Sequence, residues 1–298
     1  MDISLLNSFR LTAAERNLRV YGVHVYKKGE GCVEHRFRSD DFVNLYSASK
    51  TFTSVGVGIC RDEGGLKLED KVLAYFPEYE GVAAKGSEDI ALRDLLHMAS
   101  GKGVAWCDER EADVAGAFFK AKLDWKPGER FFYSNYCTYM LGRVVEKVSG
   151  QKLRDYLIGK LFGPLDIFNP QWQECPAGHT VAATGLFLKT SGLAKIGRLL
   201  LDGGEFEGKR IVSAEYVERL HSDTVDSAPT NTDAESAAGY GYQVWRCTLP
   251  GVYRADGMYG QFSIVLPDKG AVVTLTSHNE TGANDIVRAV FSDILPLL

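Results

Sequence analysis

The chain has 298 residues, of which 45% are hydrophobic and 24% charged, and its formal net charge at pH 7 is -5. A chain of this length and composition buries a sizeable core, as one large domain or as two tightly packed subdomains. The negative charge leaves no basic stripe to neutralise phosphates, which excludes electrostatic nucleic-acid binding as the main function.

The N-terminal sequence MDISLLNSFRLTAAERN carries Asp2 where a secretory leader would be basic, and it lacks an apolar stretch with a cleavage site. No apolar run approaches the roughly 20 residues that span a bilayer, so we expect no membrane contact. The six cysteines include no Cys-x-x-Cys pair and no zinc-ligand spacing, so we expect unpaired thiols and no metal or other cofactor. These features favour a cytoplasmic protein, although a secreted protein that has lost its signal peptide would share them.

The first part of the chain carries strand patterns followed by a helical one. After a short amphipathic helix, residues 19–38 alternate apolar and polar residues on both sides of Lys-Lys-Gly-Glu-Gly, which predicts a β-hairpin. Apolar residues then recur at a helical spacing from Phe52 onward, and the pattern ends at Gly64 and Gly65. We therefore expect a buried helix that starts at Ser47.

The middle of the chain, residues 66–184, lacks strong alternation and carries helical patterns such as TYMLGRVVEKVSG. Two more helices are predicted at SGLAKIGRLLLDGG and SAEYVERLHS, and residues 221–239 are predicted to form a mobile surface loop. Alternating strands follow at GYQVWRCTL, GVYRAD, GQFSIVLP and GAVVTLTSH, and a final helix, NDIVRAVFSDIL, ends the chain.

Strands at both ends of the chain, with a helical insertion between them, predict one central antiparallel sheet that the two ends complete and helices flank. The predicted fold class is α+β. We expect one subdomain from residues 1–65 and 185–298 that contains the sheet, and a mainly helical inserted subdomain from residues 66–184. The active site is expected between them.

A Ser-x-x-Lys pair, Ser47 and Lys50, lies at the predicted start of the buried helix. The unsatisfied amides and the positive end of the helix dipole would favour negative charge on the serine oxygen, and Lys50 lies one turn further on the same face. In an apolar pocket the neutral lysine amine could accept the serine proton. The alternative is a helix-capping serine followed by a surface lysine, as expected for a second pair, Ser149 and Lys152.

The one Tyr-x-Asn of the sequence, Tyr133 and Asn135, precedes a helix in WKPGERFFYSNYCTYMLG. A phenol can relay a proton between a nucleophile and a leaving group, and a carboxamide can orient a substrate carbonyl or amide. The alternative is that Ser134 or Asn135 caps the helix while Tyr133 packs in the core.

Several segments together resemble the serine β-lactamase and penicillin-binding-protein superfamily, nearest to class C-like esterases and 6-aminohexanoate-dimer-hydrolase-like proteins. YSASKTFTS is similar to the nucleophile motif, and PGERFFYSN is similar to the second catalytic motif. Further similar segments are LLHMASG, GLFLKTSGLAKIGRLLLDGGEFEGKRIVS, GYGYQVW and ADGMYGQF. They follow the family's order along most of the chain.

The resemblance implies a role for each residue of the two motifs. Ser47 would be the acylated nucleophile and Lys50 its activating partner. Tyr133 would relay the proton, and Asn135 would bind the substrate through its amide. The resemblance also implies that His97, in LLHMASG, is structural rather than catalytic.

The third motif departs from the lactamase pattern. Lactamases of this superfamily carry Lys-Thr-Gly or a close variant, whereas this chain has Ala255, Asp256 and Gly257, so the cation that would meet a lactam carboxylate is missing. Asp256 beside that position disfavours an anionic substrate, and strand alternation directs Arg254 to the opposite face from Ala255. The resemblance places an oxyanion hole at the backbone N–H groups of the nucleophile and of Met258.

The leading hypothesis is a metal-free serine hydrolase that forms an acyl-enzyme at Ser47 and acts on small esters or amides. One alternative is a true class C-type β-lactamase or D-Ala-D-Ala-type peptidase, and a second is a non-catalytic binding protein on the same scaffold. The sequence has no Gly-x-Ser-x-Gly and no His-Glu-x-x-His, so α/β-hydrolase and zincin chemistry lack their anchors. The expected partner is a small ester, amide or lactam substrate, and no sequence feature specifies an oligomeric state.

Overall fold

The structure, a computed structural model, describes residues 1–105 and 111–298. At its centre is a six-stranded antiparallel sheet with the strand order β2-β1-β11-β10-β9-β8. These strands are β1 (Val20–Lys27), β2 (Gly31–Arg36), β8 (Trp245–Arg246), β9 (Tyr253–Gly257), β10 (Gln261–Leu266) and β11 (Ala271–Ser277). Because β1 from the beginning of the chain pairs with β11 from its end, both ends complete the sheet, as predicted.

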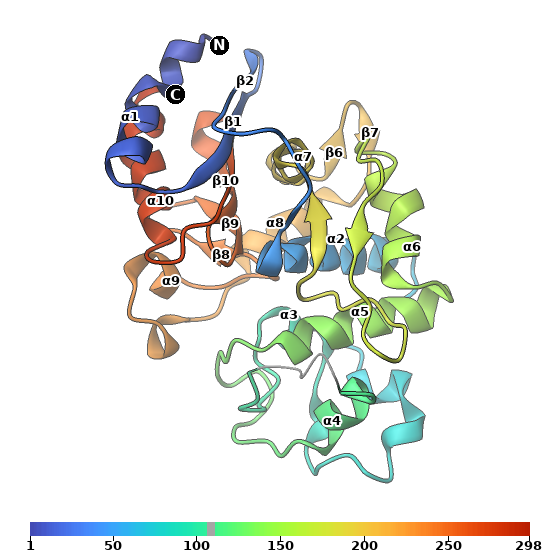
Figure 1. Cartoon of the computed structure of the whole chain (residues 1–298). Helices are drawn as coiled ribbons and strands as arrows, with labels where there is room; N and C mark the ends of the chain where they lie inside the picture. Colours follow the sequence, from blue (N-terminus) through green and yellow to red (C-terminus); the bar gives the residue numbers. More distant parts are fainter. Residues whose placement is uncertain (106–110) are drawn as a thin grey trace.

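Helices cover both faces of this sheet, with α1 and α10 on one face and α7 on the other (Figure 1). The α-helices are α1 (Asn7–Glu15), α2 (Ser49–Asp62), α3 (Leu92–Leu96), α4 (Val114–Lys120), α5 (Asn135–Ser149), α6 (Leu153–Leu157), α7 (Thr190–Leu201), α8 (Ala214–Ser222), α9 (Ala234–Ala237) and α10 (Asn284–Ala289). Side chains on a strand point to opposite faces in turn. Phe262 and Ile264 of β10 thus pack with α1 and α10, and Val265 packs in the core on the other side. The predicted α+β class is confirmed.

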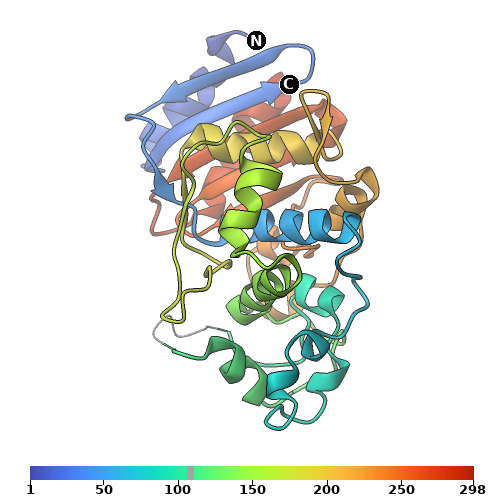
Figure 2. The same ribbon diagram turned by 90° about the vertical axis from the view of Figure 1, so that its right-hand side faces the viewer.

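Helix α2 lies between the sheet and the region of residues 66–184 (Figure 2). All its residues from Ser49 to Cys60 are buried, since it packs against β9 on one side and against α5 and α6 on the other. Gly58 allows a close approach of α8, because a Cβ at that position would lie 2.5 Å from the Tyr216 ring. A helix that is covered on all sides is fixed in position. This burial determines where the N-terminus of α2 lies.

The buried helix starts later than predicted. Residues Tyr46–Ala48 form a short 3₁₀-helix, and α2 itself begins at Ser49. Tyr46 has a φ of 47°, a left-handed conformation that the regular helix cannot include, so the chain turns before the α-helix can begin. Ser47 therefore lies in the turn before α2.

The structure also contains elements that the sequence patterns did not predict. Short strands form two small sheets, from β3 (Val43–Asn44), β5 (Leu186–Leu188) and β4 (Gln171–Trp172), and from β6 (Glu205–Phe206) and β7 (Lys209–Arg210). Residues 221–239, expected as a surface loop, include α9, whose Glu235 is buried. The Glu235 carboxylate accepts a hydrogen bond from the Thr248 backbone N–H at 3.0 Å. The backbone carbonyl oxygen of Glu235 accepts one from Arg254 Nη1 at 3.1 Å. These bonds link α9 to the segment after β8 and to Arg254 of β9.

Close packing of α7 on the sheet generates a stability prediction. A Cβ on Gly197 would overlap the Ser263 hydroxyl oxygen and lie 2.6 Å from a methyl carbon of Val272. We expect Gly197→Ala to lower the free energy of unfolding by about 1–3 kcal/mol, as overpacking does, measured by urea denaturation. Gly159→Ala is the control, because a Cβ there meets no atom within 4 Å. Equal unfolding midpoints for the two variants would contradict the prediction.

Candidate active site

Ser47, the proposed nucleophile, lies in the turn that links β3 to α2. The left-handed Tyr46 before it is held by two contacts. Its backbone N–H donates to Asn44 Oδ1 at 2.8 Å, and its ring packs edge-on against the Tyr259 ring, with 5.1 Å between the centroids. Ser47 remains partly exposed, whereas the residues that follow it in α2 are buried. The turn thus places an accessible hydroxyl at the buried end of the helix.

Lys50 lies one turn into α2, and its side chain is buried, with 1% of the residue exposed. Its Nζ lies 3.0 Å from Ser47 Oγ, 2.7 Å from Asn135 Oδ1 and 2.8 Å from the backbone oxygen of Ala183. These three oxygens come from three separate segments of the chain. The amine is therefore held in one position beside the serine hydroxyl.

Tyr133 lies just before α5 and covers the same amine. Lys50 Nζ is 4.9 Å from the centroid of the Tyr133 ring, and the Tyr133 hydroxyl lies close enough to the Ser47 side chain for that side chain to affect its pKa. Burial raises the pKa of Tyr133 well above its usual value, although the nearby Ser47 side chain opposes this effect, so the phenol is protonated at neutral pH. The ring stacks on Trp245 at 5.5 Å and meets Tyr240 edge-on at 6.0 Å. The phenol is thus fixed beside the serine by an aromatic cluster.

The third motif lies at the end of β9. A Cβ on Gly257 would overlap the backbone oxygen of Leu45 and lie 3.1 Å from the backbone nitrogen of Ala48, so the strand touches the turn that carries the serine. Glycine is needed here because any side chain would push the strand away. Met258 follows directly, with 45% of the residue exposed. Ala255 packs in the core that contains α2, on the face expected from strand alternation.

Arg254 and Asp256 lie on the other face of β9 and bond to each other. The Arg254 guanidinium donates from Nε to Asp256 Oδ2 at 2.8 Å and from Nη1 to the Arg246 carbonyl oxygen at 3.0 Å, and the arginine is fully buried. Burial raises the pKa of Asp256 above its usual value, and the neighbouring Arg254 opposes this effect. Since Arg254 already neutralises Asp256, repulsion of an anionic substrate by this carboxylate is weaker than the sequence alone indicated.

Lys102, which directly follows LLHMASG, also hydrogen-bonds to oxygen atoms of the protein. Its buried Nζ donates to Ser87 Oγ at 2.8 Å and to the backbone oxygen of Ala121 at 2.5 Å. Burial lowers the pKa of Lys102 to about 8. Lys102 therefore serves the packing of the inserted region, and its buried position keeps it from acting as a cation at the turn that carries Ser47.

The second Ser-x-x-Lys of the sequence lies apart from this cluster. Ser149 Oγ donates to the Gln151 backbone oxygen at 3.2 Å, and Lys152 Nζ pairs with Glu174 at 2.7 Å. The serine and the lysine thus bond to different groups, as the capping alternative predicts for a serine at a helix end. Of the two Ser-x-x-Lys sequences, Ser47 and Lys50 are the pair whose side chains bond to each other.

His97, the histidine of LLHMASG, is held by the protein around it. Its ring bonds to the backbone oxygen of Asp223 at 2.9 Å and packs against the Tyr242 ring, with 4.9 Å between the centroids. Burial lowers the pKa of His97, although the bond to Asp223 opposes this effect. These contacts are structural.

Two features of the site have no signal in the motifs. The Ala183 carbonyl is a backbone group that any residue would supply, so no residue type could reveal it. The aromatic cluster joins Tyr133 to Tyr240 and Trp245, which are distant in sequence. The segment GYGYQVW, which includes the last two, was noted only as similar to a family segment.

In residues 1–105 and 111–298, no group of three or more His, Cys, Asp and Glu side chains could hold a metal ion. The cysteines described there are free, four of them buried, while Cys107 lies outside the described residues. No helix in the same ranges is long and apolar enough to cross a membrane.

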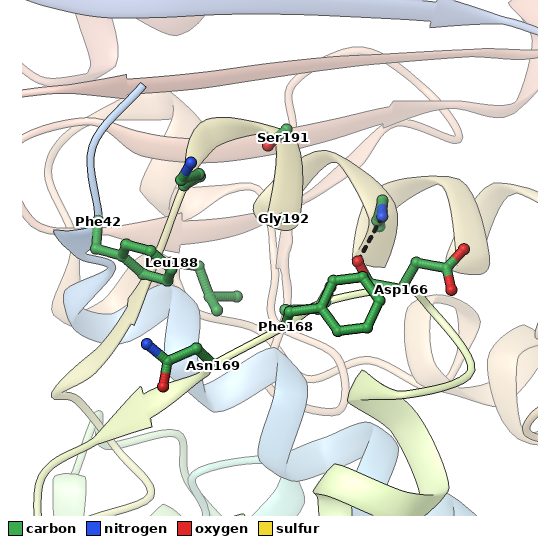
Figure 3. A pocket seen from close by; sticks show the side chains of 10 residues that line it. Phe42, Asp166, Phe168, Asn169, Leu188, Ser191 and Gly192 are labelled. Carbon is green, nitrogen blue, oxygen red and sulfur yellow. Dashed lines mark hydrogen bonds between the residues drawn. The ribbon is translucent and has the colours of Figure 1, made fainter. Parts of the chain in front are cut away.

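A separate cavity of about 300 Å³ lies between the start of α7, residues 166–169 and Phe42 (Figure 3). In its wall, Lys195 Nζ donates to the backbone oxygen of Asp166 at 2.8 Å. Ser191, also in the wall, donates its hydroxyl to Asp40 at 3.0 Å. Because this serine bonds to a carboxylate and to neither lysine of the wall, the cavity lacks the serine–amine pair found at Ser47.

Comparisons with known proteins agree with this geometry. A family model described as Beta-lactamase matches residues 11–292. The protein from Paenarthrobacter ureafaciens named 6-aminohexanoate-dimer hydrolase is 28% identical over 270 residues, which are 81% of this chain and 67% of that protein.

Solved structures share the fold at lower sequence identity. A penicillin-binding protein homologue from Pyrococcus abyssi has a TM-score of 0.77 and 23% identity, covering 100% of this chain and 78% of that one. A D-stereospecific amidohydrolase from Streptomyces sp. has a TM-score of 0.72 and 18% identity, covering 98% of this chain and 99% of that one. Since the family model matches nearly the whole chain, the protein belongs to the β-lactamase family of serine hydrolases.

Proposed function

We propose that the protein hydrolyses small esters or amides through an acyl-enzyme at Ser47. The observation that carries this proposal is the buried Lys50 amine 3.0 Å from Ser47 Oγ, with the Tyr133 ring 4.9 Å from the same amine. A nucleophile within hydrogen-bond reach of its base, with the base itself oriented by further groups, is the arrangement of covalent catalysis. The relative named 6-aminohexanoate-dimer hydrolase supports an amide or ester substrate.

In the proposed reaction, the neutral Lys50 amine takes the hydroxyl proton while Ser47 Oγ bonds to the substrate carbonyl carbon. The backbone N–H groups of Ser47 and Met258 would stabilise the resulting oxyanion, because β9 approaches the catalytic turn at Gly257. Tyr133 then passes the proton to the leaving alcohol or amine as the bond to it breaks. A water molecule finally releases the acyl group as a carboxylic acid and restores the serine hydroxyl.

We also propose that the site lies between two subdomains, residues 1–65 with 185–298 and residues 66–184. Ser47 and Lys50 belong to the first, and Tyr133 belongs to the second. Active sites between domains are common, because the boundary is concave. The free cysteines of the described chain support a cytoplasmic location.

The first prediction identifies the nucleophile. We expect a fluorophosphonate to label wild-type protein at Ser47 and to leave Ser47→Ala unlabelled, as measured by intact mass and peptide mapping. Lys50→Ala should lower the turnover of a p-nitrophenyl ester by a factor of about 10² to 10⁴, the range for loss of a general base. Ser149→Ala is the matched control and should be labelled like the wild type. Labelling at Ser149 in the wild type would refute the assignment.

A second prediction concerns the approach of β9 to the catalytic turn. We expect Gly257→Ala to lower kcat/KM for a p-nitrophenyl ester about 100-fold, since displacing a catalytic group by about 1 Å has that effect. Gly81→Ala is the control, because a Cβ there meets no atom within 4 Å. Urea midpoints measured alongside show whether both variants are folded. Wild-type kcat/KM in folded Gly257→Ala would contradict the proposed oxyanion hole.

A third prediction concerns substrate charge. At Ala255 the protein offers no cation that could bind the carboxylate of an anionic lactam. Loss of one charge-assisted hydrogen bond of about 1.5–3 kcal/mol corresponds to a decrease of roughly 10- to 100-fold in kcat/KM. We therefore expect the wild type to hydrolyse a neutral p-nitrophenyl ester with a higher kcat/KM than nitrocefin. Ala255 is buried, so folding of Ala255→Lys is checked first. The folded variant should have a higher ratio of kcat/KM for nitrocefin to kcat/KM for the ester than the wild type has. Faster nitrocefin hydrolysis by the wild type would favour the true β-lactamase alternative.

A further inference from the structure

The segment before β5 supplies a backbone acceptor to the proposed base, and its conformation is unusual. Ala182 has a φ of 63°, in the left-handed region that alanine rarely adopts. This turn is followed by two carbonyl groups, of Ala182 and Ala183, that both bond to side chains of α2.

Two side chains of α2 hydrogen-bond to the oxygens of these carbonyl groups. Lys50 Nζ bonds to the Ala183 oxygen at 2.8 Å, and Thr53 Oγ1 donates to the Ala182 oxygen at 3.0 Å. Thr53 is three residues after Lys50, so the two side chains lie on the same face of the helix. Thr53 is fully buried. Its hydroxyl therefore has a fixed partner in the residue next to the Lys50 acceptor.

The segment is also confined from its other side. A Cβ on Gly142 of α5 would lie 2.8 Å from the Cβ of Ala182, so α5 approaches this residue closely. The backbone N–H of Ala183 donates to the Val181 oxygen at 2.6 Å, which tightens the same turn. Packing limits sideways movement of the segment, and Thr53 adds a hydrogen bond to its Ala182 carbonyl group.

We propose that Thr53 is a positioning residue for the general base, a role that rests on the proposed function. A neutral amine has two N–H groups and one lone pair. If Asn135 Oδ1 and the Ala183 oxygen accept the two N–H groups, the lone pair is left to face Ser47 Oγ, from which it takes the proton. The resulting ammonium keeps both bonds, and its third N–H is the proton that passes on toward Tyr133. Thr53 acts by fixing the second of these acceptors.

The chain offers a matched control in the same helix. Thr51 Oγ1 donates to the backbone oxygen of Gln243 at 3.0 Å, and Thr51 is also fully buried. Gln243, like Ala182, has a left-handed conformation, with a φ of 62°. The two threonines thus make the same kind of bond, but the oxygen of Gln243 lies next to no acceptor of the proposed base. A stability effect is expected at both positions, and an effect on catalysis only at Thr53.

The test compares Ser, Ala and Val at each threonine, with a neutral p-nitrophenyl ester as substrate and fluorophosphonate labelling of Ser47 as a second readout. We expect Thr53→Val and Thr53→Ala to lower kcat and the labelling rate by about 10- to 100-fold with KM within about twofold, the size of effect that misplaced groups have. Thr53→Ser keeps the hydroxyl and should retain most of the activity. Thr51→Val and Thr51→Ala should keep wild-type kcat once the folded fraction is corrected for.

Each outcome decides one question. If the wild type neither hydrolyses the ester nor reacts with the fluorophosphonate, the proposed function fails. If the wild type is active and the Thr53 variants behave like the Thr51 variants, the positioning role is overturned and the function stands. Where a valine variant does not fold, the Ser and Ala pair decides, because these two differ only by the hydroxyl. Equal kcat for Thr53→Ser and Thr53→Ala would also overturn the role.

Discussion

The buried amine of Lys50 is the constraint on which the arrangement of the site depends. A polar group removed from water is unfavourable unless its donors find acceptors, and for an amine the penalty amounts to several kcal/mol. The acceptors at Ser47, Asn135 and Ala183 come from the turn before α2, the start of α5 and the segment before β5. These segments can satisfy the amine only if they meet at one point. Stability and the catalytic arrangement thus require the same contacts.

The fold brings these segments together because α2 is buried between two parts of the chain. The sheet, made from both chain ends, covers it on one side, and α5 covers it on the other. At the N-terminal end of α2, the close approach of Gly257 to Leu45 fixes β9 against the catalytic turn. The left-handed Tyr46 keeps that turn outside the helix, which leaves Ser47 partly exposed beside the buried Lys50. The chain thus passes from the partly exposed Ser47 to the fully buried Lys50 within one helical turn.

The sequence predicts groups that side-chain patterns specify, and it fails where the backbone decides. Alternation and helical spacing predicted the sheet and α2, and in the structure the Lys50 amine lies 3.0 Å from Ser47 Oγ and 4.9 Å from the Tyr133 ring. Ala183 could not be found, because any residue type would supply its backbone carbonyl, and the positive φ of the preceding Ala182 is one that no alanine propensity favours. The short helix α9 was missed for a similar reason, since buried Glu235 bonds to distant Thr248 and Arg254. The catalytic roles themselves remain predictions.

The charges around β9 are balanced inside the protein, which bears on what the site can select. Arg254 is fully buried and bonded to Asp256, so neither charge is free for a substrate, and Ala255 adds none on the face toward α2. Without an accessible cation at this strand, binding would depend more on shape and apolar contact than on pairing with an anion. The ring of Tyr133, stacked on Trp245, offers such a surface directly beside the nucleophile. Under the proposed function, selectivity for the acyl group would depend on this aromatic wall, because Ala255 of the third motif supplies no cation that could pair with an anionic substrate.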